Sequence, residues 1–248
     1  MKRHILTVIG ALTLTACAAS APVPTAPVAI PAPVVLTPQA AAESRFVDRM
    51  DAQTAVRTLV SVVDRIEPVA EAACREAGIE PNCNFEFAVD ANPLAQPNAF
   101  QTLVKGDQPL IAFTASLVAE ARNADELAFI LSHEAAHHIL GHIAQQRQAA
   151  SIGAAVMGQL VGLSDDPRAR RDAAAFGAAV GARTYSQQFE LEADVLGTQI
   201  AARAGFNPLR GAEFFFRIPD PGNTFLGSHP ANADRVRVVQ ATARSLGY

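Results

Sequence analysis

The segment His133-Glu134-Ala135-Ala136-His137 is the most informative part of this chain, because it places two imidazoles one helical turn apart with a carboxylate between them. Side chains at positions i and i+4 of a helix lie on one face, so both rings can reach a single metal ion. The carboxylate of Glu134 falls at the edge of that face, where it can hold a water against the metal. This spacing is typical of zinc hydrolases.

The residues around the motif predict a partly buried helix. Capping side chains in the segment 123–126 precede an apolar run with helical spacing. An unpaired glutamate or histidine in such an apolar wall is unfavourable by several kcal/mol unless it is paired, neutralised or metal-bound. Burial therefore favours a metal site over an accidental match on a solvated amphipathic helix. The apolar run consists of Leu127, Ile130, Leu131, Ala135, Ile139 and Ile143.

A second helical motif supplies the third ligand that a tetrahedral zinc ion requires. Glu190 and Asp194 are again four residues apart, so one helix presents two carboxylates on one face. We expect one carboxylate to bind the metal and the other to accept a hydrogen bond from a ligand imidazole. Glu192 is a competing ligand candidate, but it lies off the face that Glu190 and Asp194 share. The sequence therefore predicts Glu190 as the metal ligand.

With these motifs the chain resembles the gluzincin metallopeptidases, the family of the HtpX-type membrane proteases, the CAAX prenyl proteases and the BepA and LoiP periplasmic lipoproteins. The resemblance covers roughly residues 55 to 246, and the chain resembles a lipoprotein member without a TPR domain. It implies that His133, His137 and Glu190 ligate zinc, that Glu134 is the general base and acid, and that Asp194 orients a ligand histidine. The matching segments are Asn98-Ala99-Phe100, Asp125 to Ala128, the two motifs, and Ser228-His229-Pro230 followed by Arg235.

Three further histidines need separate interpretation. His229 precedes Pro230 in a Gly/Ser-containing loop, where a histidine can be merely a turn residue. The resemblance implies that His229 faces the active site, either donating a hydrogen bond to the oxyanion of the tetrahedral intermediate or capping the metal in a resting state. His138 and His142 lie next to the first motif but are rotated off its face. They are expected to lie on the helix surface or to support the metal ligands from behind, and neither is assigned to the site.

The N-terminal segment predicts export and lipid anchoring. Residues 1–16 combine a basic start with an apolar core too short to span a bilayer, and Leu14-Thr15-Ala16-Cys17 is similar to a lipoprotein cleavage box. Cys17 would be the lipidated first mature residue, and the Ala18 that follows favours export to the outer membrane. A plain secretory signal cut near Ala18 or Ala21 is the alternative. Residues 17–42 are rich in Ala and Pro and are expected to form a semi-rigid tether.

Cys74 and Cys83 are the other two cysteines, and in an exported chain they are expected to form a disulfide that closes a short loop. The formal net charge is −4 at pH 7, and signal cleavage would remove Lys2 and Arg3 and make the mature chain more negative. A nucleic-acid partner is therefore not expected.

Residues 43–248 have the length and apolar content of a single domain. We expect an α+β, mostly helical, zincin-like metallopeptidase domain with a small β-sheet beside the H-E-x-x-H helix. Helical pieces are predicted at Phe46 to Ile66 and at Pro68 to Ala77. One strand is predicted where Phe85, Phe87 and Val89 alternate, and a second at Leu110 to Phe113. The resemblance implies that this second strand is the exposed edge above the metal helix, where a peptide docks as an added strand.

The segment Ala149 to Leu163 is rich in Ala and Gly and is too short to cross a membrane. Gly158 and Gly162 have the spacing that lets two helices approach closely. One interpretation is a tightly packed helix or loop between the two metal-binding helices. The others are a lid over the cleft and an apolar patch that faces lipid or a membrane-protein substrate.

Together these features predict a zinc-dependent endopeptidase of the bacterial cell envelope, with one Zn²⁺ per chain, anchored by lipid to the outer membrane and facing the periplasm. Its expected partners are unfolded or misassembled envelope polypeptides, which it would hydrolyse with a water activated by Glu134. The alternative is a zinc-containing chaperone or scaffold lipoprotein whose site is occluded. An intact Glu134 distinguishes the two readings, because a purely structural zinc site does not need it.

Overall fold

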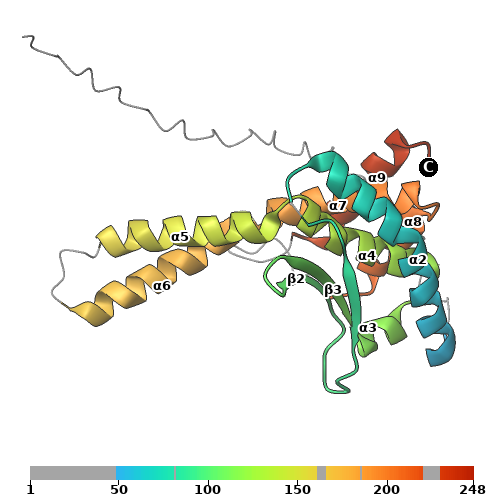
Figure 1. Ribbon diagram of the computed structural model, residues 1–248, viewed down its shortest axis with the longest axis horizontal. Coiled ribbons are helices and arrows are strands. Elements are labelled where there is room, and N and C mark those ends of the chain that lie inside the picture. The colour runs from blue at the N-terminus through green and yellow to red at the C-terminus, as the bar shows by residue number, and fades with distance from the viewer. Residues whose placement is uncertain (1–48, 81, 161–165, 185, 220–229) are drawn as a thin grey trace, which may run out of the picture.

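The computed structural model describes residues 49–80, 82–160, 166–184, 186–219 and 230–248. Helices make up most of this part of the chain, and a three-stranded sheet lies beside them (Figure 1). The prediction of a mostly helical α+β domain with a small sheet is therefore confirmed. The expected signal peptide, Cys17, the tether and His229 lie outside the described residues.

Helix α2 (Ala52–Ala77) begins with the side chain of Asp51, which accepts a hydrogen bond from the Thr54 N–H at 2.9 Å, and ends at Gly78 with a φ of 64°. The sequence predicted two helical pieces separated near Pro68, and this was wrong, because one helix continues through the proline. A proline removes one backbone hydrogen bond, but burial of a continuous apolar face on both sides of it keeps the helix intact. That face consists of Ala55, Leu59, Val62, Ile66, Ala70 and Ala73.

The sheet has the order β1-β3-β2, with β1 parallel and β2 antiparallel to β3. Its strands are β1 (Glu86–Asp90), β2 (Ala99–Val104) and β3 (Gln108–Thr114). The expectation that Leu110 to Phe113 forms the exposed edge is wrong, because these residues lie in the central strand. Ile111, Ala112 and Phe113 are buried, as expected of a strand that is hydrogen-bonded on both sides. The edge strand that packs against the metal helix is β2.

Helix α4 (Ala124–Ile139) is the central element and carries the H-E-x-x-H motif. The side chain of Asn123 caps its start by accepting a hydrogen bond from the Glu126 N–H at 3.0 Å. It packs against α2, β2 and α7 (Ser186–Arg203). Since most of its residues are buried, the predicted burial of this helix is confirmed. The short helix α3 (Ala115–Glu120) connects β3 to the α4 region.

Helices α5 (His142–Leu160) and α6 (Pro167–Thr184) pack against each other as a hairpin that projects from the body of the molecule (Figure 1). A Cβ added at Gly153 would collide with the Gly177 carbonyl, and one added at Gly181 would collide with the Ala149 carbonyl. The close approach therefore depends on these glycines and not on Gly158, where an added Cβ would meet, among the described residues, only Ala174 Cβ at 3.8 Å; Gly162 lies outside the described residues. The described part of the segment is a tightly packed helix that lies between the two metal-binding helices in the chain, and its exposed apolar side chains are Ile152, Val156 and Leu160.

The C-terminal part consists of α8 (Pro208–Gly211), the 3₁₀ helix η2 (Ala212–Phe216) and α9 (Asn232–Ser245), which packs against α7. A disulfide joins Cys74 at the end of α2 to Cys83, with the Cα atoms 5.6 Å apart. No described helix is both long enough and apolar enough to span a membrane.

Candidate metal centre

Helix α4 brings the two motif histidines together as its spacing predicts. The Nε2 atoms of His133 and His137 lie 3.1 Å apart, and the rings meet edge to face with centroids separated by 4.7 Å. His133 is 6% exposed, and His137 is partly buried at the mouth of the site. Two imidazole nitrogens that face each other at this distance can serve as two of the ligand atoms of one metal ion.

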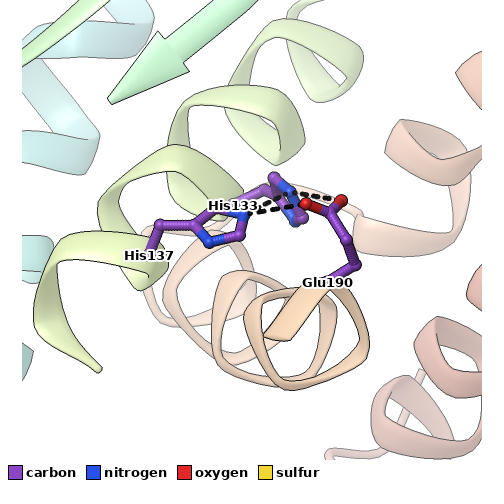
Figure 2. Close-up of side chains that lie close together, drawn as sticks. All are labelled: His133, His137 and Glu190. Carbon is purple, nitrogen blue, oxygen red and sulfur yellow. Dashed lines mark hydrogen bonds and ion pairs between the residues drawn. The ribbon is translucent and has the colours of Figure 1, made fainter. Parts of the chain in front are cut away.

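Helix α7 supplies the third donor across a gap of 53 residues from His137 in the sequence. Glu190 Oε2 lies 3.4 Å from His133 Nε2, and Glu190 Oε1 lies 3.4 Å from His137 Nε2. Donor atoms of all three residues fall within 4.8 Å of one another, and Figure 2 shows the side chains converging from the two helices. Two imidazole nitrogens and one carboxylate oxygen are a ligand set that zinc takes in hydrolytic sites, so the residues fit a metal ion.

Asp194 lies one turn after Glu190 and is fully buried. Its Oδ1 atom is 2.9 Å from His133 Nδ1, which leaves His133 Nε2 directed toward His137 and Glu190. This is the arrangement expected of a carboxylate that fixes the tautomer and orientation of a ligand histidine.

Arg235 of α9 holds Asp194 in place from the other side. Its Nε donates to Asp194 Oδ2 at 2.8 Å and its Nη2 donates to Oδ1 at 2.7 Å, while its Nη1 lies 3.4 Å from Glu190 Oε2. The guanidinium also stacks on the Phe215 ring at 4.3 Å. A planar, bidentate cation is suited to a buried carboxylate, so Arg235 compensates the charge that α7 brings into the core.

The buried charges shift the protonation equilibria of the centre. Burial and the Arg235 cation favour the neutral ring of His133, but hydrogen bonds to Asp194 and Glu190 outweigh them and raise the pKa of His133 to about 9 in the metal-free protein. Burial also favours the protonated form of Asp194, yet the charge and hydrogen bonds of Arg235 hold its pKa below the ordinary value. Glu134, which is partly exposed, is among the carboxylates that raise the pKa of Arg235.

The model of Peptidase family M48 matches residues 62–243, which include both motifs and the whole centre. The chain belongs to peptidase family M48. The metallopeptidase family that the sequence resembles is thereby confirmed, and the domain described here is an M48 metallopeptidase domain.

Three curated proteins are similar in sequence to this M48 chain. It is 30% identical over 184 residues to a Vibrio cholerae protein assigned as a beta-barrel assembly-enhancing protease, covering 66% of this chain and 38% of the relative. It is 26% identical over 182 residues to the mitochondrial metalloendopeptidase OMA1 of Saccharomyces cerevisiae, covering 68% and 51%. It is 30% identical over 159 residues to the beta-barrel assembly-enhancing protease of Escherichia coli K12, covering 50% and 32%. The chain thus spans about half or less of the length of these relatives.

The M48 centre contains two residues whose contacts the sequence does not predict. Helical periodicity rotates His142 off the α4 face, yet its Nδ1 lies 2.9 Å from His137 Nδ1, where it supports a metal-ligand candidate. The reason is that α4 ends before Gly141, which has a φ of 67°, so the helical wheel of α4 does not give the direction of His142. Glu192, the ligand candidate that was passed over in favour of Glu190, lies 3.2 Å from His142 Nε2. The Gly141 next to His142 was the signal that could have revealed the turn.

The M48 domain contains two more histidines, His138 and His229. His138 points away from the centre, with its Nε2 2.6 Å from the Asn82 carbonyl and its ring edge-on to Phe85. His229 lies outside the described residues, so its role stays a prediction. Burial, outweighing the hydrogen bond to Glu192, lowers the pKa of His142, and the ring is therefore neutral at neutral pH.

Gly197 sets the distance between the two metal-binding helices of the M48 domain. A Cβ on this residue would lie 2.9 Å from the His133 N and 3.0 Å from its Cα, which are backbone atoms that cannot rotate away. We expect Gly197→Ala to push α7 from α4, to lower the free energy of unfolding by about 1–3 kcal/mol and to weaken metal binding. The measurements are urea denaturation and titration with zinc.

Gly158→Ala is the matched control, because its Cβ would meet only Ala174 Cβ at 3.8 Å on the exposed hairpin. Since alanine favours a helix over glycine by about 1 kcal/mol, this variant should be as stable as the parent or slightly more so. Equal zinc affinity in Gly197→Ala and the parent would show that the helix spacing does not limit the site.

Proposed function

We propose that this chain is a zinc-dependent endopeptidase of the bacterial cell envelope that hydrolyses unfolded or misassembled polypeptides. The observation that carries the proposal is the convergence of His133, His137 and Glu190 within 4.8 Å, with Glu134 next to the first histidine. His133, His137 and Glu190 would hold the ion. When bound, zinc polarises the scissile carbonyl and lowers the pKa of a coordinated water.

The chain's own residues account for the proton transfers. Glu134 accepts the proton of the attacking water and delivers it to the departing amine. Asp194 keeps His133 in the tautomer whose Nε2 lone pair faces the ion, through the 2.9 Å contact at Nδ1. Arg235 keeps Asp194 ionised, and it adds a positive charge beside Glu190.

The substrate is proposed to add as a strand to β2. Among the described strands β2 pairs only with β3, and Phe100 on it is 40% exposed. A cavity of about 50 Å³ lies beside this strand, and its lining includes Gln101 and Leu103 of β2 and the ligand candidate His137. Main-chain pairing along an edge accepts any extended polypeptide, so it favours substrates that are locally unfolded.

The envelope location rests on the predicted signal peptide and on Cys17, and the names of two relatives point to β-barrel proteins as a substrate class.

The deciding experiment is digestion of casein by the purified, zinc-loaded full chain, with and without a chelator. Cleavage that stops with the chelator and returns with zinc supports the proposal. Zinc binding without cleavage would favour the chaperone or scaffold reading instead.

Zinc binding is expected to weaken as the pH falls from about 9 to about 6.5. His133 carries a proton with a pKa of about 9 in the metal-free protein, and this proton has to leave before Nε2 can bind a metal. Below that pKa each unit by which the pH falls should raise the Kd for zinc about tenfold, whereas above it the Kd should level off. Competition with a chromophoric chelator across this range measures the slope. A flat profile would show that the His133 proton does not compete with zinc.

A further inference from the structure

We propose that Glu192 and His142 form a positioning relay that orients the metal ligand His137. The inference rests on the proposed zinc site and adds two residues to it. It starts from an asymmetry in that site: Asp194 contacts His133 directly at Nδ1, but no carboxylate among the described contacts touches His137 at the same atom.

The ring of His142 occupies that position behind His137. The Nδ1 atoms of the two rings lie 2.9 Å apart, and the far nitrogen of His142, Nε2, lies 3.2 Å from Glu192 Oε2. An ionised carboxylate only accepts hydrogen bonds, so His142 Nε2 must be the donor to Glu192. A neutral His142 then has a lone pair on Nδ1, and His137 Nδ1–H must donate to it. The only nitrogen of His137 left with a lone pair is Nε2, which faces His133 Nε2 and Glu190.

The surroundings hold the relay in this geometry. His142 is 4% exposed, and its ring stacks on Phe189 with centroids 4.4 Å apart and planes 14° apart. Phe189 directly precedes the ligand Glu190, so the same turn of α7 supports both. On the other side of Glu192, the Gln188 amide donates to its Oε1 at 2.7 Å. Both oxygens of Glu192 are thereby engaged, which fixes the carboxylate that His142 faces.

The test compares the Kd for zinc of full-chain variants at one pH. His142→Leu removes the acceptor for His137 Nδ1–H and is expected to raise the Kd about 10- to 100-fold, the range found for partners of metal ligands. His142→Asn should recover most of the affinity, because the amide oxygen can take the place of Nδ1 as acceptor. Glu192→Leu should raise the Kd as well. Adding it to His142→Leu should change little, because Glu192 acts only through His142.

His138→Leu is the matched control. His138 is also a buried histidine next to His137, but it bonds to the Asn82 carbonyl away from the centre. Its removal should lower stability to urea without changing the Kd for zinc. A second readout is the tautomer of His137 in the metal-free protein, measured by nitrogen-15 NMR of the imidazoles. The parent should show the proton on Nδ1, and His142→Leu should lose this preference.

The results of these measurements distinguish failure of the proposed relay from failure of the proposed zinc site. If the parent binds zinc and His142→Leu binds it equally well with the same His137 tautomer, the relay is wrong and the proposed function stands. If His142→Leu and His138→Leu weaken zinc binding equally, His142 only supports the fold and the relay is again overturned. If the parent binds no zinc, the proposed function fails and the relay fails with it.

Discussion

Replacing Glu134 by glutamine is expected to lower the rate of casein cleavage by about 10²- to 10⁴-fold while the zinc content stays at that of the parent. Glutamine has nearly the same shape, but it cannot accept a proton from the attacking water or return one to the amine. His133, His137 and Glu190 are unchanged, so the ion remains bound. The measurements are cleavage kinetics and metal analysis on the same preparation.

The control is Glu71→Gln on α2, where the carboxylate forms an i, i+4 ion pair with Arg75 at 3.3 Å. This variant removes the same charge from the chain but should keep full activity. Undiminished cleavage by Glu134→Gln would reject Glu134 as the general base. Loss of zinc from Glu134→Gln would mean that the carboxylate helps to hold the metal.

Replacing Arg235 by methionine is expected to destabilise the metal-free protein by about 3–5 kcal/mol, because Asp194 would remain buried without its bidentate partner. Asp194 is 0% exposed and receives hydrogen bonds from both Nε and Nη2 of Arg235. Urea denaturation in the presence of a chelator measures this free energy without a contribution from zinc.

The chain contains a matched control for this variant at its surface. Arg203 makes a similar bidentate pair with Glu76, at 3.1 and 3.2 Å, but both side chains are largely in water. Arg203→Met should therefore leave the free energy of unfolding nearly unchanged. Adding Asp194→Asn to Arg235→Met should restore part of the lost stability, because the uncompensated charge is gone. If Arg235→Met lowers the free energy of unfolding no more than Arg203→Met does, the buried pair does not stabilise the fold.

The parts of the site that the sequence predicts are those governed by helical periodicity. His133 and His137, like Glu190 and Asp194, are four residues apart within one helix, so their shared faces follow from local geometry. That the two helices meet was inferred from chemistry, since a zinc ion needs a third protein ligand. The closeness of that meeting depends on Gly197, whose role is visible only when His133 lies opposite it.

The parts that the sequence does not predict depend on chain reversals and on long-range pairing. The direction of the His142 side chain does not follow from the helical periodicity of α4, because the backbone turns at Gly141. The expectation that Leu110 to Phe113 forms the exposed edge was wrong, because an apolar strand can be central or lie at an edge, and only its partners decide. Arg235 was noted as part of a matching segment, but its bidentate contact with Asp194 joins residues 41 positions apart.

We expect the α5–α6 hairpin to lower the entropic penalty of bringing the two metal-binding helices together during folding. Joining α4 to α7 through an unstructured connection of this length would carry the full entropic penalty of closing a long loop. Two helices that pair with each other through Gly153, Gly177 and Gly181 bring their own ends together, so the start of α7 is delivered beside the end of α4. Changes of length at the far end of the hairpin should therefore be tolerated by the centre, whereas changes at its root, where His142 lies, should not.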